Sequence, residues 1–112
     1  MDPKLLMNFR ERLDQEAAEL RAAEAGTAED RAPVELDQQS VGRLSRMDAM
    51  QQQAMAEAQS RRRAGRLRAI MAALKRIETD DFGWCEECGE EIPIGRLNLD
   101  PCAPRCVDCA TG

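Results

Sequence analysis

The chain carries two Cys-x-x-Cys pairs, Cys85-Glu86-Glu87-Cys88 and Cys106-Val107-Asp108-Cys109, with seventeen residues between them. Two such turns direct four thiolates at one point, which makes a tetrahedral metal site. A site closed by four sulfur ligands leaves no position for water or substrate, and is therefore structural rather than catalytic. The sequence predicts one structural Zn²⁺, with iron as the alternative metal, on Cys85, Cys88, Cys106 and Cys109.

A fifth cysteine, Cys102, has no place in a tetrahedral four-thiolate site. It is expected to be a free thiol, with a spare ligand or a redox-sensitive residue as the sharper alternative. An odd number of cysteines, metal-type spacing and the lack of a signal-peptide pattern together indicate a reducing cytoplasm rather than a disulfide framework. Gly89, directly after the first pair, can take the positive φ that such a turn often needs.

Composition argues against several classes of function. The 112 residues include no histidine and no glycine-rich phosphate loop, so the common nucleophile and nucleotide sites are missing and an enzyme is not expected. Two Phe and one Trp cannot build a large aromatic core, so zinc substitutes for one. No apolar run approaches the length of a membrane span.

The pattern of apolar residues predicts a mainly α fold. Asp2-Pro3 is a helix start signal, and apolar residues then recur at spacings of three and four, which predicts a helix over 3–24. Residues 25–37 contain glycine, proline and several acids, as is typical of a loop. A second helix is expected over 38–78. The predicted domains are a helical hairpin, 1–79, and a zinc-finger module, 80–112.

An antiparallel, coiled-coil-like hairpin across that loop has an expected register. It pairs Leu20 with the region of Arg43–Leu44 and Leu13 with that of Met50, so that the first helix ends its pairing near Ser60. Leu44, Met47 and Met55 then belong to the hairpin core.

A second apolar stripe lies beyond this pairing and consists of Leu67, Ile70, Leu74 and Ile77. We expect the zinc module to cover it. The residues expected to do so are Phe82, Trp84, Ile92 and Leu97. A homo-oligomer formed through the same stripe is the alternative.

The residues around the cysteines also carry a family resemblance. Asp81-Phe82-Gly83-Trp84-Cys85-x-x-Cys88-Gly89, followed at fixed spacings by Ile92, Arg96-Leu97, Pro101 and the second cysteine pair, resembles the DksA/TraR family (DnaK suppressor proteins). The motif spans 81–109, and the preceding long charged helix extends the likeness. The resemblance implies a bacterial transcription factor that binds RNA polymerase through its secondary channel, with the finger on the rim and acidic residues at the hairpin tip.

The tip candidates in this chain are Asp30, Glu35 and Asp37, whose carboxylates could perturb a catalytic Mg²⁺ of the polymerase. The best-known members carry Asp-x-x-Asp-x-Ala at the tip, and this hexapeptide does not occur here. Asp100 and Ala110 stand where members that bind the alarmone ppGpp have basic residues. An alarmone site of that type is therefore not expected.

Five arginines lie within eight residues of the second predicted helix: Arg61, Arg62, Arg63, Arg66 and Arg68. A solvated or intramolecular role, a contact with the polymerase, and nucleic-acid binding are the three readings. The net charge of −5 and the shortage of aromatic residues argue against direct DNA binding.

The sequence thus favours a cytoplasmic zinc-finger regulator that acts through RNA polymerase by protein contact. The alternative, from another class, is a structural or adaptor module that forms homo-oligomers or docks a helical partner without acting on the polymerase.

Overall fold

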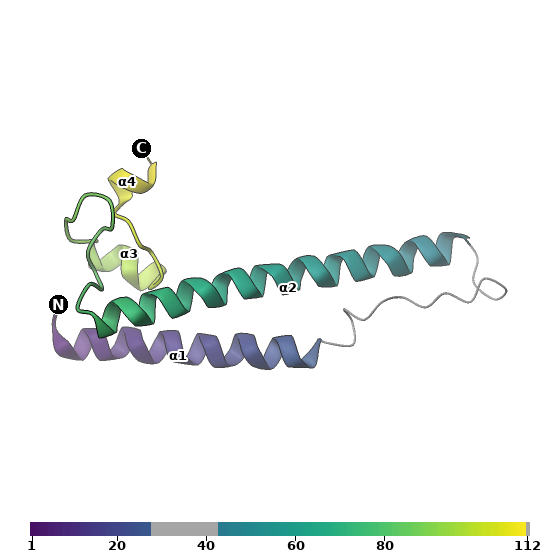
Figure 1. Ribbon diagram of the computed structural model, residues 1–112, viewed down its shortest axis with the longest axis horizontal. Helices are drawn as coiled ribbons and strands as arrows, with labels where there is room; N and C mark the ends of the chain where they lie inside the picture. The colour runs from purple at the N-terminus through teal and green to yellow at the C-terminus, as the bar shows by residue number, and fades with distance from the viewer. Residues whose placement is uncertain (28–42, 112) are drawn as a thin grey trace. The chain divides into compact units, whose positions relative to one another are not determined.

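The computed structural model describes residues 1–27 and 43–111. In these residues it contains the helices α1 (Pro3–Gly26), α2 (Arg43–Glu78), α3 (Ile94–Leu99) and α4 (Val107–Thr111), as Figure 1 shows. The described residues form no strand, and one isolated antiparallel bridge joins Trp84 to Glu91. The mainly α fold, a helical hairpin followed by a small four-cysteine module, is confirmed.

The chain divides into two compact units. The cysteine-bearing unit is Met1–Ala18 together with Leu67–Gly112, and the polar unit is Glu19–Arg66. In each unit a segment of α1 runs antiparallel to a segment of α2 (Figure 1). The expected domain boundary between the hairpin, 1–79, and the zinc-finger module, 80–112, stays a prediction.

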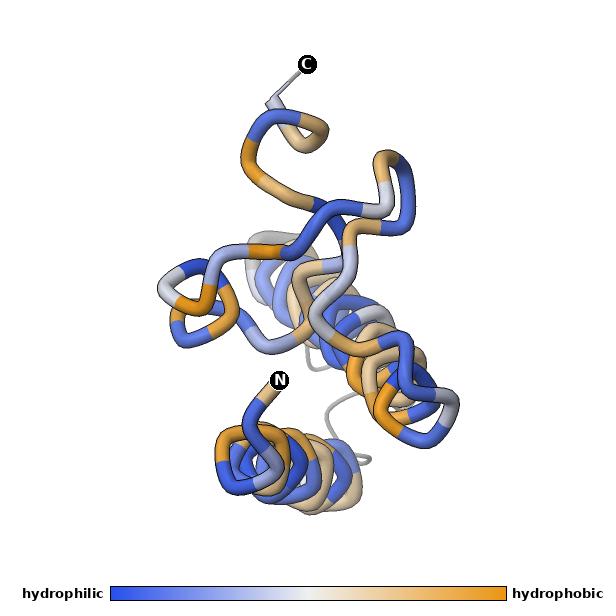
Figure 2. The backbone as a smooth tube through the Cα atoms, turned by 90° about the vertical axis from the view of Figure 1, so that its left-hand side faces the viewer, coloured by the Kyte–Doolittle hydropathy of each residue, from blue (hydrophilic) through white to orange (hydrophobic). Residues whose placement is uncertain are grey.

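The start of α1 follows from its first residues. The Asp2 side chain accepts a hydrogen bond from the backbone N–H of Lys4 at 3.0 Å, which makes Asp2 the N-cap and Pro3 the first helical residue. The buried face of α1 then consists of Phe9, Leu13 and Ala17, at the spacing of four that one helix face requires. Figure 2 shows hydrophobic and hydrophilic residues alternating around both long helices.

The end of α2 is fixed by a backbone motif. The N–H of Asp81 donates to the carbonyl of Arg76 at 2.8 Å, and the N–H of Asp80 donates to that of Ile77 at 3.4 Å. This is the Schellman pattern, and it places Asp80 in the left-handed region, at φ 61°. Glycine usually fills this position, so the chain leaves α2 through a conformation that costs a non-glycine residue energy.

The expected register of the hairpin is wrong. In the polar unit, Glu24 in the last turn of α1 contacts Ser60 at 2.6 Å and Arg63 at 2.9 Å, whereas the expected register placed Leu20 near residue 43. The pairing is therefore shifted by about six helical turns, from the number of residues per turn. The expectation assumed that the second helix turned back directly after a short loop, but the described α2 pairs with α1 only from near Ser60 onward.

This register explains the second apolar stripe. In the cysteine-bearing unit, Ile70, Ala73 and Ile77 are buried on α2, as are three residues of α1 in the same unit. The stripe is thus core within one protomer. The alternative of a homo-oligomer through Leu67, Ile70, Leu74 and Ile77 stays untested, and burial of two of the four residues does not favour it.

Two further expectations about the core need correction. Met47 and Met55 are exposed, because the pairing of α1 with α2 does not reach them. Of the four finger residues expected to cover the stripe, Phe82, Ile92 and Leu97 are buried, but Trp84 is 46% exposed. Leu44 lies among the residues whose side chains are not described.

Candidate functional site

The first cysteine pair sits on a tight turn. The N–H of Gly89 donates to the Cys85 carbonyl at 2.9 Å, and the N–H of Cys85 donates to the Glu90 carbonyl at 2.8 Å. Closing this turn requires a positive φ at Gly89, and the value is 73°. The expectation for Gly89 is confirmed, and Cys85 is buried while Cys88 is exposed.

The second cysteine pair lies at the start of α4. The N–H of Ala110 donates to the Cys106 carbonyl at 3.0 Å, so Cys106 immediately precedes the helix and Cys109 lies within its single turn. The two cysteine turns are joined by backbone and side chain. The N–H of Glu86 donates to the Pro104 carbonyl at 3.0 Å, and Arg105 pairs with Glu87 at 3.1 Å.

The geometry of the four sulfurs fits zinc. The ligand atoms of Cys85, Cys88, Cys106 and Cys109 all lie within 4.8 Å of one another, and the sulfurs of Cys88 and Cys106 are 3.7 Å apart. Four sulfurs about 2.3 Å from a tetrahedral zinc are separated by roughly 3.8 Å. The C4 site therefore holds one structural Zn²⁺, and within residues 1–27 and 43–111 the cluster includes no fifth protein ligand.

The pKa values of Cys85 and Cys109 are shifted in opposite directions. The backbone N–H of Cys88 lowers the pKa of Cys85 to about 6. The sulfur of Cys106, as a hydrogen-bond partner, raises the pKa of Cys109. Because a cysteine binds zinc as the thiolate, loading the site displaces protons, and a low pH opposes it.

Cys102 lies outside this cluster. Its side chain is 6% exposed, its N–H donates to the Asp100 carboxylate at 3.0 Å, and its carbonyl accepts from Arg76 at 3.4 Å. A buried thiol whose backbone is fixed on both sides is a core residue of the finger. The interpretation as a spare metal ligand is not supported by this geometry.

The other predicted site residues are more scattered. Asp30, Glu35 and Asp37 lie outside the described residues. Among the arginines of α2, Arg61, Arg62 and Arg68 are exposed, while Arg63 and Arg66 are half-buried.

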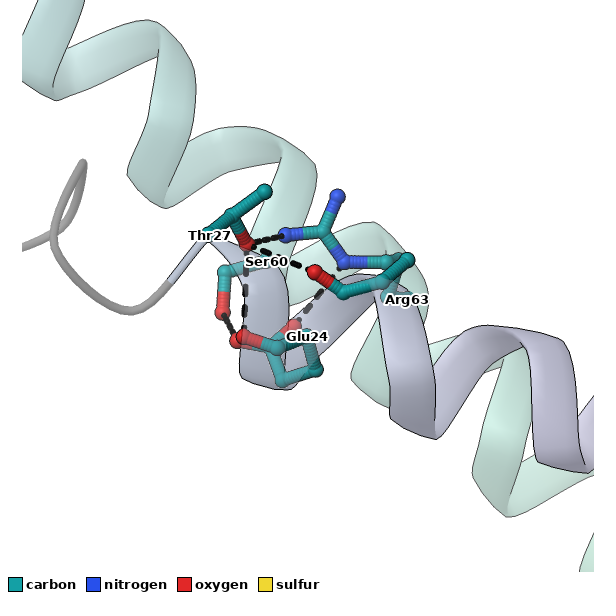
Figure 3. Close-up of polar contacts among 5 residues, drawn as sticks. Glu24, Thr27, Ser60 and Arg63 are labelled. Carbon is teal, nitrogen blue, oxygen red and sulfur yellow. Dashed lines mark hydrogen bonds and ion pairs between the residues drawn. The ribbon is translucent and has the colours of Figure 1, made fainter.

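The polar contacts of Arg63 were not foreseen from the sequence. Figure 3 shows its guanidinium between the Glu24 carboxylate at 2.9 Å and the Thr27 hydroxyl at 2.7 Å, while Ser60 donates to the same carboxylate. These partners are 36 to 39 residues apart, so no local pattern could reveal them. Arg63 therefore has the intramolecular role that was one of the three interpretations of the arginine cluster.

Fold and site together define the class: an α-helical hairpin protein with a structural four-cysteine zinc finger. Residues 80–112 match the prokaryotic dksA/traR C4-type zinc finger. The match confirms the resemblance to the DksA/TraR family that the motif of this segment carries.

Three relatives illustrate the likeness. The RNA polymerase-binding transcription factor DksA of Haemophilus influenzae is 53% identical over 45 residues, which are 40% of this chain and 31% of that protein. DksA of Escherichia coli K12 is 49% identical over 45 residues, 40% of this chain and 30% of that protein. The Buchnera aphidicola protein is 39% identical over 64 residues, 56% and 42% of the two chains. The match thus spans less than half of each curated relative.

A solved structure extends the likeness beyond the finger. The structure of transcription factor DksA2 from Pseudomonas aeruginosa superposes with a TM-score of 0.82 at 27% identity, covering 99% of this chain and 84% of that one.

None of the described helices combines the length and the apolar character needed to cross a bilayer.

Proposed function

We propose that this protein is a bacterial transcription regulator that binds RNA polymerase through its secondary channel, with the zinc finger as its base and the acidic loop as its tip. The observation that carries the proposal is the zinc-finger match over residues 80–112, together with 53% identity over 45 residues to a protein named for binding RNA polymerase. The likeness to DksA2 over nearly the whole chain supports the same function for the hairpin. The relatives' names do not favour the structural or adaptor alternative.

The proposed partner contact is made by protein surfaces and not by DNA. Zinc in a closed four-thiolate site supplies no catalysis, so the protein is proposed to act as a ligand of the polymerase and not as an enzyme. Because bacterial RNA polymerase acts in the cytoplasm, the protein is proposed to act there as well. Arg61 and Arg62, exposed on α2, are proposed as basic contacts, whereas Arg63 is engaged with Glu24.

The tip acids are the second part of the proposal. The carboxylates of the expected acidic loop are proposed to act near the polymerase active site, where a catalytic Mg²⁺ prefers oxygen ligands. They belong to Asp30, Glu35 and Asp37. The chain lacks the Asp-x-x-Asp-x-Ala hexapeptide of the best-known members. Binding and regulation must therefore be tested separately.

The test measures binding to purified core RNA polymerase and transcription from a ribosomal promoter in the same preparation. We expect binding at or below micromolar concentration. The pair Glu35→Gln and Asp37→Asn should abolish the effect on transcription while binding persists. Glu57→Gln, at an exposed acid on α2, is the matched control. No binding at micromolar concentration would reject the proposal, and an unchanged effect in the paired variant would reject the role of the tip.

A further inference from the structure

A hollow lies in the surface of the cysteine-bearing unit where the start of α1 meets the finger. Its volume is about 410 Å³. Buried Phe82 and Ile92 contribute to its lining, and so do the exposed side chains of Trp84 and Ile94. The hollow does not include the zinc ligands, so the metal site does not account for it.

The apolar side chains around this hollow are held in place by backbone bonds. Trp84 forms the antiparallel bridge with Glu91, and the N–H of Ile92 donates to the Gly83 carbonyl at 2.8 Å. Gly83 has a φ of 90°, which favours glycine. Its lack of a side chain leaves room for the close approach of Met1. Trp84 and Ile94 are nevertheless 46% and 40% exposed. A tryptophan on a hydrogen-bonded backbone, half open to water beside a second apolar side chain, is typical of an anchor point for a partner.

The charges at the hollow indicate which partner fits. The charged side chains in its lining are Asp2 and Glu91, both acidic and both exposed. The finger sequence around it, residues 80–112, holds eight acids and two bases. A second copy of this chain that docked through the same hollow would bring acids against acids, whereas a basic segment would be attracted.

We propose that this hollow binds RNA polymerase. It accommodates an apolar side chain of the polymerase that is flanked by lysine or arginine. The inference rests on the proposed function and adds to it the residues and the chemistry of the contact. The apolar side chain packs on Trp84 and Ile94, and the flanking cations face Glu91 and Asp2. The apolar contact supplies most of the affinity, and the charges supply orientation and the rate of association.

The test compares variants in competition binding to core RNA polymerase. Trp84→Ala should weaken binding by about tenfold or more, the loss that defines an interface anchor. Leu99→Ala is the matched control, because Leu99 belongs to the same unit, is 89% exposed and does not line the hollow. Zinc content and far-UV circular dichroism of each variant show that the finger is folded.

The charge part has a matched pair of neighbours. Glu91→Lys should weaken binding several-fold and flatten its dependence on salt, because its carboxylate lines the hollow. Glu90→Lys makes the same change one residue away, at an exposed side chain outside the lining, and should have a smaller effect. Equal effects of the two variants would show that overall charge, and not the hollow, acts on binding.

Footprinting reports the contact directly. Trp84 is the sole tryptophan, and hydroxyl-radical oxidation of it should fall several-fold in the complex, while that of Met71, exposed to a similar degree on α2, should not.

If the wild-type protein binds polymerase and Trp84→Ala binds equally well, the hollow is not the contact and the proposed function stands. If the wild type does not bind at all, the proposed function fails first. A concentration-dependent dimer that Trp84→Ala abolishes would instead assign the hollow to a second copy and overturn the inference.

Discussion

The two units of this chain are stabilised by different kinds of contact. Every residue of the apolar core, including the largest fully buried side chains Phe9, Leu13, Ile70 and Leu97, belongs to the cysteine-bearing unit, which also holds the metal cluster. Among the described residues of the polar unit none is buried, and its interhelical contacts include the bonds of Glu24 with Ser60 and Arg63. Burial of apolar area and metal binding contribute far more free energy than partly exposed polar pairs.

The difference separates the part of the protein that must be rigid from the part that need not be. A finger that grips a partner needs a fixed surface, and metal and core together supply one. The proposed entry of the hairpin into a channel requires a polar surface, and the interhelical contacts of the polar unit include the ion pair of Glu24 with Arg63. The four predictions below test this division, from the largest expected effect to the smallest.

Loss of the metal should have the largest effect. Cys85→Ser removes a buried ligand, and a structural zinc site of this type contributes roughly 10 kcal/mol of binding that is also folding free energy. We expect the zinc content to fall from one per chain to near zero and the near-ultraviolet circular dichroism of Trp84 to flatten. Most of the far-ultraviolet helical signal should remain, because α1 and α2 comprise 24 and 36 residues.

Cys102→Ser is the control, since Cys102 is buried but is not among the clustered cysteines. It should retain one zinc per chain. Loss of zinc in this variant would mean that the fifth thiol takes part in the site. Complete unfolding of Cys85→Ser would show instead that the hairpin depends on the metal.

The core of the cysteine-bearing unit gives the second prediction. The rings of Phe9 and Phe82 are tilted by 50° with their centroids 5.6 Å apart, and the Arg12 guanidinium lies 5.8 Å from the Phe9 centroid. Phe9→Ala should lower the free energy of unfolding by about 3–5 kcal/mol, the usual cost of a large buried cavity. Urea denaturation measures it, and Met7→Ala, exposed on the same helix, should change it by less than about 0.5 kcal/mol.

The features of the finger could be predicted from the sequence. The spacing of the cysteines and the residues around Trp84 indicate the metal site and the family, because turn geometry and ligand number depend on residues close together in the chain. The register of the hairpin does not follow from such patterns. Two amphipathic helices can pair at several offsets, and the offset here depends on contacts such as Glu24 with Ser60, which no local pattern encodes.

The exposure of Trp84 was missed for a related reason. It was expected, with Phe82, Ile92 and Leu97, to cover the apolar stripe of the second helix, since a large aromatic side chain is usually highly buried. Trp84 lies opposite Glu91 in the bridge, and both side chains are exposed, whereas their chain neighbours Cys85 and Ile92 are buried. The alternation of facing directions could be predicted only if the bridge were known beforehand.

The third prediction concerns the polar unit. Glu24→Gln and Arg63→Met should each destabilise the protein by about 1 kcal/mol, because the side chains of Arg63 and Glu24 are 18% and 32% exposed and solvent screens their attraction. The double variant should cost less than the sum of the two, which a double-mutant cycle measures. Hydrogen exchange should rise in the last turn of α1 and stay unchanged around Phe9. A loss as large as that of Phe9→Ala would contradict the division between the two units.

The smallest effect is expected where α2 leads into the finger. Asp80 has a φ of 61° at the position of the Schellman motif that glycine usually fills, and its carboxylate sits at the negative end of a long helix. Asp80→Gly removes both unfavourable features, whereas the greater freedom of glycine in the unfolded chain opposes the gain, so a net stabilisation of up to about 1 kcal/mol is expected. Asp80→Ala removes the charge but keeps the side chain in the left-handed region, and should bring no such gain. If thermal unfolding shows equal stabilisation by the two variants, the charge is responsible. If only glycine stabilises, the strained backbone at Asp80 destabilises the cysteine-bearing unit at the point where α2 ends and the finger begins.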